Sequence, residues 1–190
     1  MILTNEKRPN GYVDAQAELI DPVARRAINS ANELAAWPIL LTGGVGCGKT
    51  SAAAVQYGCH KSPLWFRADD LLLSMSFGRK DGMRFESSRW FSQTETLPWN
   101  KFVQTMESQR RHVILDDLAV RSPTEAMQQS LFDLLEWRKG KPLLITSNKL
   151  PDEIGRLYDD RIRSRIEAGT VIEMGGMDRR TGTGYRIKAR

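Results

Sequence analysis

The chain of 190 residues contains only two cysteines, Cys47 and Cys59, which are too few for a disulfide framework or a zinc site. It has no apolar run near the roughly 18 residues that a membrane-spanning helix needs, and its first residues lack the apolar stretch of a signal peptide. It also has no internal repeat and no long low-complexity linker. From these absences we expect a cytoplasmic protein with no membrane partner.

The basic charge is spread unevenly along the chain, which has a formal net charge of +5. Residues 176–190 hold five basic side chains and one acidic side chain, so they account for most of this excess. We expect a short N-terminal extension over residues 1–20, one α/β domain over 21–175 and a basic tail over 176–190. The tail is either a solvated end or a contact for a polyanion, and charge alone does not decide between them.

Short apolar runs alternate with segments that have helical periodicity or helix caps. The apolar runs predict strands at 39–42, 64–67, 112–117, 142–146 and 170–174. The other segments predict helices at 22–35, 49–57, 69–75, 99–109, 122–139, 151–157 and 159–168. Within the less regular stretch 77–100, a turn is predicted at 77–82 and a helix at 84–93. The alternation of strands and helices indicates a parallel sheet that is covered on both faces.

A glycine-rich loop follows the first predicted strand and matches the phosphate-binding pattern G-x-x-x-x-G-K-[ST] in full. Glycines let the backbone curl so that successive N–H groups converge on phosphate, and the following helix adds its positive end. We expect ATP and Mg²⁺ as cofactors, with Lys49 reaching the β- and γ-phosphates and Thr50 as a metal ligand. A chance glycine turn is the alternative. The predicted nucleotide-binding residues are Gly43, Gly44, Val45, Gly46, Cys47, Gly48, Lys49, Thr50 and Ser51.

Two later strands end in polar side chains at the edge where the glycine-rich loop should lie. Asp116 suits the coordination shell of Mg²⁺, and Asp117 suits orienting or deprotonating an attacking water. Asn148, which ends the sequence Leu143–Asn148, would hold that water or contact the γ-phosphate. Solvated acids at a strand end and a turn asparagine are the alternatives, and the order of the motifs favours the functional interpretation.

A predicted helix near the end of the domain carries Arg161 and Arg165, which share one face because they are four residues apart. One interpretation is an arginine that a subunit supplies to its neighbour's nucleotide. The other is a solvated basic face that pairs with Asp159, Asp160 and Glu167.

In this order the motifs resemble those of an AAA+ ATPase, and more closely those of the DnaC/DnaI-like helicase loaders and the IstB-like transposition ATPases. The matching segments are "LLTGGVGCGKTSAA", "WFRADDLLLSM", "HVILDDLA", "PLLITSNKLPDEI" and "DRIRSRI". The resemblance implies a three-layer P-loop NTPase fold, an AAA+ core without a separate lid domain, with parallel strands in the order 5-1-4-3-2. It implies these roles: Walker A for Gly43–Thr50, Walker B for Asp116 and Asp117, sensor 1 for Asn148, arginine finger for Arg161 or Arg165, and sensor 2 for Arg180.

The resemblance also places an insertion that grips single-stranded DNA at residues 77–100. Basic and aromatic side chains interleave there, which suits backbone attraction and base stacking. They are Arg79, Lys80, Arg84, Arg89, Trp90 and Trp99. The alternative for the two tryptophans is ordinary packing. Loaders of this family usually have a separate N-terminal helicase-binding domain, whereas about 20 residues precede the first predicted helix here.

We therefore expect an ATP-hydrolysing DNA-replication accessory protein that forms a homo-oligomer, or a co-oligomer with a related ATPase. Single-stranded DNA and a replicative helicase are its expected partners. The alternatives are an IstB-like transposition helper, a small P-loop kinase and a non-catalytic module that holds ATP as a structural ligand. Asp116, Asp117 and Asn148 argue against the kinase, because they suggest an attacking water in place of an acceptor substrate.

Overall fold

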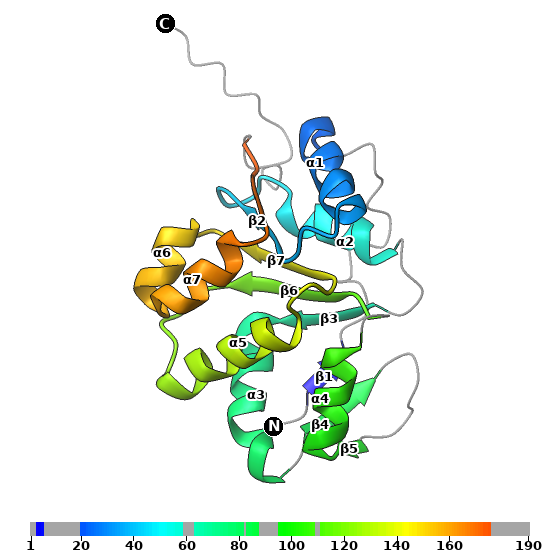
Figure 1. Ribbon diagram of the computed structural model, residues 1–190, viewed down its shortest axis with the longest axis vertical. Coiled ribbons are helices and arrows are strands. Elements are labelled where there is room, and N and C mark those ends of the chain that lie inside the picture. Colours follow the sequence, from blue (N-terminus) through cyan, green and yellow to red (C-terminus); the bar gives the residue numbers. More distant parts are fainter. Residues whose placement is uncertain are drawn as a thin grey trace, which may run out of the picture.

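A central parallel sheet organises the computed structural model, which describes residues 3–5, 20–58, 63–81, 83–87, 95–108 and 111–175 (Figure 1). Its five strands are β2 (Ile39–Thr42), β3 (Leu64–Arg67), β6 (Val113–Leu118), β7 (Leu143–Ser147) and β8 (Thr170–Glu173). Each strand lies within one residue of its predicted bounds. The hydrogen-bonded order β3-β6-β7-β2-β8 is the predicted order 5-1-4-3-2 read from the opposite edge, so that prediction is confirmed.

Helices cover both faces of this sheet, because alternate residues of each strand point to opposite sides. Leu40, Phe66 and Leu115 belong to the larger half of the core. The helices of this half are α3 (Ala68–Asp81), α4 (Trp99–Glu107), α5 (Glu125–Trp137), α6 (Pro151–Leu157) and α7 (Asp160–Glu167). Leu41 and Trp65 belong to the smaller half, with the helices α1 (Pro22–Glu33) and α2 (Lys49–Gly58). The fold is therefore the predicted three-layer α/β arrangement (Figure 1).

The described helices begin within one residue of their predicted starts, except for α5. The Asp21 side chain accepts hydrogen bonds from the N–H groups of Val23 and Ala24 at 2.7 and 3.2 Å, as its place before a proline predicts. Helix α5 begins at Glu125 and is capped by Thr124, so the predicted start at residue 122 is too early. None of the described helices is long and apolar enough to cross a membrane.

A second, three-stranded sheet was not predicted. Strand β4 (Met83–Ser87) pairs in parallel with β1 (Leu3–Asn5) and antiparallel with β5 (Glu95–Leu97). The helix predicted at 84–93 is therefore wrong over 84–87, and residues 88–94 lie outside the described part. Figure 1 shows this small sheet beside α4 at one end of the molecule, far from α1.

The turn predicted at 77–82 is wrong over residues 77–81, because α3 continues to Asp81. Tertiary packing explains why Gly78 does not end the helix. A Cβ at Gly78 would lie 2.2 Å from Sδ of Met83, which is buried in the larger half of the core. The glycine therefore makes room for a core methionine, and burial outweighs its low helix propensity.

Arg138 is a buried cation at the end of α5, with an exposed fraction of 1%. Its Nη1 donates to the carbonyl oxygens of Met106 and Ser108 at 2.7 and 2.9 Å. Its Nη2 donates to those of Arg111 and Pro142, both at 2.6 Å. Burial lowers the pKa of Arg138 to about 10, so the guanidinium stays charged at neutral pH. One side chain thus ties the end of α4 to the segments that lead into β6 and β7.

We expect Arg138→Met to lower the free energy of unfolding by about 2–4 kcal/mol, because four carbonyl groups lose a charged donor. Urea unfolding followed by circular dichroism measures the change. The control is Lys139→Met, which alters the exposed neighbour and should leave the unfolding midpoint almost unchanged. Equal midpoints for the two variants would contradict the assignment of Arg138 as a clamp.

Candidate functional site

The glycine-rich loop, Gly43–Thr50, joins the end of β2 to the start of α2. Gly43, Gly46 and Gly48 have φ angles of 143°, 77° and 102°, which glycine adopts readily and other residues do not. Gly43 also lies against the end of β8, since a Cβ there would be 2.2 Å from the carbonyl oxygen of Met174. The loop leads into a helix N-terminus, as the phosphate-binding interpretation requires.

Lys49 is folded into this loop, with an exposed fraction of 6%. Its Nζ donates to the carbonyl oxygens of Gly43 and Gly44 at 2.8 and 2.7 Å. It also contacts Sγ of Cys47, a buried free thiol, at 3.6 Å. The ammonium group therefore lies within the segment that is predicted to hold phosphate.

The carboxylate of Asp116 lies where the loop helix meets two strand ends. Its Oδ1 accepts a hydrogen bond from Oγ1 of Thr50 at 3.2 Å. The same oxygen accepts a second from Oγ1 of Thr146 at 2.5 Å. The two predicted metal ligands, Thr50 and Asp116, are thus in direct contact although 66 residues separate them in the sequence.

A bulge in β6 follows this carboxylate. The pairing of β6 with β7 is irregular between Leu115 and Leu118, and Asp117 and Ala119 have φ angles of 59° and 65°. This region is unfavourable for residues other than glycine, at a cost of about 1 kcal/mol each. A regular strand would send the side chains of Asp116 and Asp117 to opposite faces, and the bulge departs from that geometry.

Asn148 is exposed and lies at the same edge of the sheet. Strands β2 and β7 are parallel neighbours in which Thr42 pairs with Ser147, so Asn148 follows β7 beside the start of the loop. Oγ1 of Thr42 donates to the carbonyl oxygen of Lys149 at 2.8 Å and holds this turn against β2.

Burial, together with the smaller effect of the charge of Asp117, raises the pKa of Asp116 to about 6. The hydrogen bonds from Thr146 and Thr50 oppose this effect, and so does the charge of Arg67. Arg67 is exposed at the end of β3, where it pairs in register with Asp116. At neutral pH the carboxylate is therefore ionised, as a metal ligand must be.

The two candidate arginines of α7 lie over the same ring of α5, with Cζ of Arg161 and Arg165 at 4.9 and 4.1 Å from the Phe132 centroid. Arg161 pairs with Asp159 at 2.7 Å, and its side chain is 63% exposed. Arg165 pairs with Glu136 of α5, and its side chain is 32% exposed. Within the described chain neither arginine has a hydrogen bond or ion pair to the glycine-rich loop or to Asp116 and Asp117.

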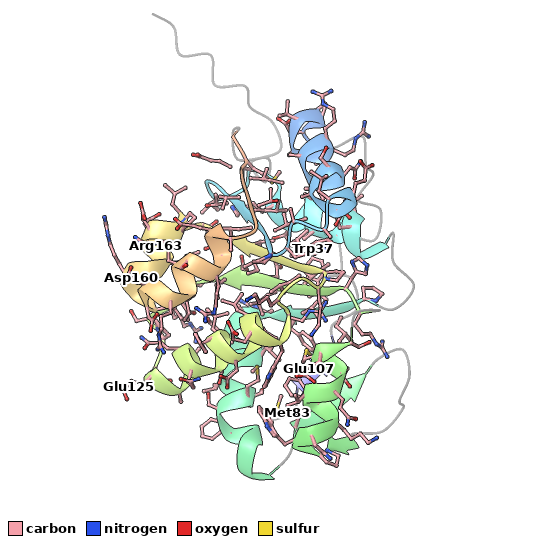
Figure 2. The ribbon with its side chains drawn as sticks, in the orientation of Figure 1. Trp37, Met83, Glu107, Glu125, Asp160 and Arg163 are labelled. Carbon is pink, nitrogen blue, oxygen red and sulfur yellow. The ribbon has the colours of Figure 1, made fainter. Side chains whose placement is uncertain are left out.

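The other acids near α7 pair with an arginine that the sequence pattern did not single out. Arg163 lies 3.1 Å from Asp152, 3.6 Å from Asp160 and 3.9 Å from Glu167 (Figure 2). A Cβ at Gly155 would lie 3.0 Å from Cβ of Arg163, so α6 and α7 approach closely along this side chain. The alternative of a solvated, acid-paired face is therefore observed for Arg161 through Asp159, and Asp160 and Glu167 pair with Arg163 instead of the two candidate arginines.

The predicted DNA contacts remain predictions. Arg89 and Trp90 lie outside the described residues, as does Arg180, the predicted sensor-2 arginine of the nucleotide site. Arg79 and Lys80 fall in α3 and Arg84 in β4, where the description covers the backbone alone. Trp99 packs against Phe102 and Trp137, with ring centroids 5.5 and 5.8 Å apart, so it joins α4 to α5 in the core.

No family model matches the chain. Its fold is similar to that of a solved DnaC helicase loader, with 16% identity and a TM-score of 0.64 over 87% of this chain and 99% of that one. It is also similar to DnaI, with 19% identity and a TM-score of 0.62 over 92% and 97% of the two chains. For AMPPCP-bound DnaA from Aquifex aeolicus the values are 22% and 0.61, over 82% of this chain and 48% of DnaA.

The chain thus spans about half the length of the DnaA structure and nearly the whole length of the DnaC and DnaI structures. At these identities the likeness concerns the fold. It confirms the three-layer α/β fold that the sequence resemblance implies, which the chain shares with the DnaC and DnaI structures.

The raised pKa of Asp116 predicts an unusual pH dependence of stability. Between its ordinary value of 3.8 and about 6, the unfolded chain loses this proton while the folded chain keeps it, so the carboxylate destabilises the fold as pH rises through that window. We expect Asp116→Asn to stabilise the protein by about 2 kcal/mol at pH 8 and to have little effect at pH 4.

Urea unfolding of both proteins at the two pH values measures this difference. The control is Asp70→Asn, which removes an exposed carboxylate near the start of α3. A change of equal size at pH 4 and pH 8 for Asp116→Asn would show that ionisation of Asp116 is not its cause.

Proposed function

We propose that the protein is an ATPase, which hydrolyses ATP to ADP and phosphate at the edge of the sheet formed by the carboxyl ends of β2, β6 and β7. The observation that carries this proposal is the contact of 3.2 Å between Oγ1 of Thr50 and Oδ1 of Asp116. If the glycine-rich loop were a chance turn, nothing would require α2 to place the Thr50 hydroxyl against the buried carboxylate of Asp116 in β6.

The residues present fit a metal–nucleotide complex. The loop Gly43–Thr50 would hold the phosphates with its backbone N–H groups, and Lys49 would balance their charge. The hydroxyl of Thr50 and the carboxylate of Asp116 are the oxygen ligands that Mg²⁺ prefers. When bound, Mg²⁺ would neutralise charge on the transferred phosphoryl group. At the same edge, Asn148 would hold the attacking water, and Asp117 would orient that water and accept its proton.

For its biological role we propose a DNA-replication accessory protein of the helicase-loader type, acting in the cytoplasm as an oligomer. The fold supports this role, since similar structures include a helicase loader and a replication initiator bound to single-stranded DNA. Single-stranded DNA and a replicative helicase are the proposed partners. An arginine of α7 would complete the nucleotide site of the next subunit. In support, the ion pairs of Arg161 and Arg165 among the described residues are with Asp159 and Glu136, outside the site of their own chain.

We expect Lys49→Ala to lower ATP turnover by about 100-fold or more, because the ammonium group is the cation of the phosphate loop. Phosphate release with and without single-stranded DNA measures the effect. Lys139→Ala, which alters an exposed lysine after α5, serves as the control and should retain full turnover. Undiminished hydrolysis by Lys49→Ala would contradict the site assignment. If the wild-type protein binds ATP without hydrolysing it, ATP is a structural ligand.

The two arginines should differ in their effect on turnover. Arg161 is the more exposed, and its ion pair within the described chain is with Asp159, the cap of its own helix. Arg165 pairs with Glu136 of α5 and lies closer than Arg161 to the Phe132 ring, at 4.1 Å against 4.9 Å. We expect Arg161→Ala to lower turnover by about 10³-fold without weakening ATP binding, and Arg165→Ala to lower stability more than turnover.

Mixing two inactive proteins tests whether the arginine acts on a neighbour. Arg161→Ala retains an intact phosphate loop, and Lys49→Ala retains an intact α7. Mixed oligomers should therefore regain part of the turnover that each variant lacks alone. If Arg161→Ala, Arg165→Ala and the double variant all hydrolyse ATP normally, the proposed role of these arginines is wrong.

A further inference from the structure

Thr146 is fully buried at the end of β7, and the sequence pattern that ends in Asn148 gave it no role of its own. Its Oγ1 donates a hydrogen bond to Oδ1 of Asp116 at 2.5 Å. The same atom accepts a hydrogen bond from the backbone N–H of Asp117 at 2.9 Å. One hydroxyl therefore contacts both acids of the proposed ATPase site.

These two bonds fix the direction of the hydroxyl, because a threonine has one hydrogen to donate. Thr146 gives that hydrogen to Asp116, and Thr50 gives its own to the same carboxylate oxygen. The other oxygen, Oδ2, takes part in neither bond. The pair of hydroxyls thus sets the rotation of the carboxylate about its χ2 angle and decides which oxygen is presented to a ligand.

The bond to Asp117 holds the bulge of β6. Asp117 has a φ angle of 59°, a conformation that persists only where the surroundings determine it. The next residue of β7, Ser147, supports the far side of the same bulge, since its Oγ donates to the carbonyl oxygen of Leu118 at 2.7 Å. Among the described residues, the side chain of Ser147 has no hydrogen bond to Asp116 or Asp117, so the side chains of Thr146 and Ser147 hold different groups.

We propose that Thr146 is a positioning residue of the ATPase site, whose hydroxyl orients the carboxylate of Asp116 for a divalent cation and keeps Asp117 in its bend. This inference rests on the proposed function. The competing explanation is that threonine occurs here because β-branched residues favour strands, in which case valine would serve equally well. The two explanations therefore differ over Thr146→Val, which keeps the shape of the side chain and loses both hydrogen bonds.

The experiment compares Thr146→Val, Thr146→Ser and Ser147→Ala with the wild type, after urea unfolding has shown that each is folded. Titration calorimetry measures the affinity for Mg²⁺ in the presence of AMPPCP, and the affinity for AMPPCP without Mg²⁺. Hydrogen exchange followed by nuclear magnetic resonance measures protection of the Asp117 amide, and steady-state kinetics measures kcat.

We expect Thr146→Val to lose about 10–100-fold in Mg²⁺ affinity and in kcat, the usual effect of removing a group that orients a metal ligand. Its affinity for AMPPCP without Mg²⁺ should be that of the wild type, and its Asp117 amide should exchange faster. Thr146→Ser keeps the hydroxyl. Its Mg²⁺ affinity, its kcat and its Asp117 amide exchange should therefore lie within about threefold of the wild-type values. Ser147→Ala should leave Mg²⁺ affinity unchanged.

Each outcome supports or overturns the inference. A folded Thr146→Val protein with wild-type Mg²⁺ affinity and Asp117 exchange overturns it, as does a loss of Mg²⁺ affinity in Ser147→Ala equal to that in Thr146→Val. If Thr146→Val does not fold, Thr146→Ser decides, because a folded Thr146→Ser protein as weak in Mg²⁺ binding as Asp116→Asn contradicts the role of the hydroxyl.

The failure of the proposed function would look different. The wild type would then bind no AMPPCP and release no phosphate, whatever the variants do. Exchange of the Asp117 amide is measured on the protein alone, so it still decides whether Thr146 holds the bend.

Discussion

The contact of the Asp116 carboxylate with two hydroxyls is the interaction on which the rest of the site depends. It joins three segments that are distant in the sequence: the start of α2 through Thr50, the end of β7 through Thr146, and β6 itself. A buried carboxylate is costly unless it is hydrogen-bonded, and burial still raises the pKa of Asp116 to about 6. The strand ends therefore meet at a carboxylate whose ionised form lowers the stability of the fold. Such a cost is expected where a carboxylate has the cation-binding role that we propose for Asp116.

Much of the fold could be predicted because its signals are local. Strands β2 and β3 match their predicted bounds. Each contains a short apolar run, which helices cover on both faces of the sheet. Asp21 marks the start of α1, because its side chain accepts hydrogen bonds from N–H groups in the first turn of the helix. The strand order is not local information, and it came from the resemblance to known ATPases. The contact between Thr50 and Asp116 follows from that order, because parallel strands bring their carboxyl ends to one edge of the sheet and only β7 separates β2 from β6.

The errors arose where structure depends on distant partners. Met83–Ser87 alternates apolar and polar residues, yet it is a strand only because Leu3–Asn5 and Glu95–Leu97 pair with it. Thr146 was overlooked for a related reason. A threonine at a strand end is ordinary, and its importance comes from a bulge in the neighbouring strand that no local pattern in β7 records. The partner of Arg165 is Glu136, which is 29 residues away on another helix. The sequence pattern therefore predicted pairing with nearer acids instead.

Helix α5 explains why Arg161 and Arg165, which lie on one face of α7, differ in how far their side chains are exposed. Its first turn follows the bend after Asp117, and its last residue precedes Arg138, which is fixed to four carbonyl groups. Between these anchors, Phe132 and Glu136 meet α7 and hold Arg165, while Arg161 stays exposed one turn earlier. Helix α5 thus also decides which arginine stays exposed. The two halves of the proposed site are therefore linked through one helix, although within the described residues no side chain of α7 has an ion pair with the glycine-rich loop of its own chain.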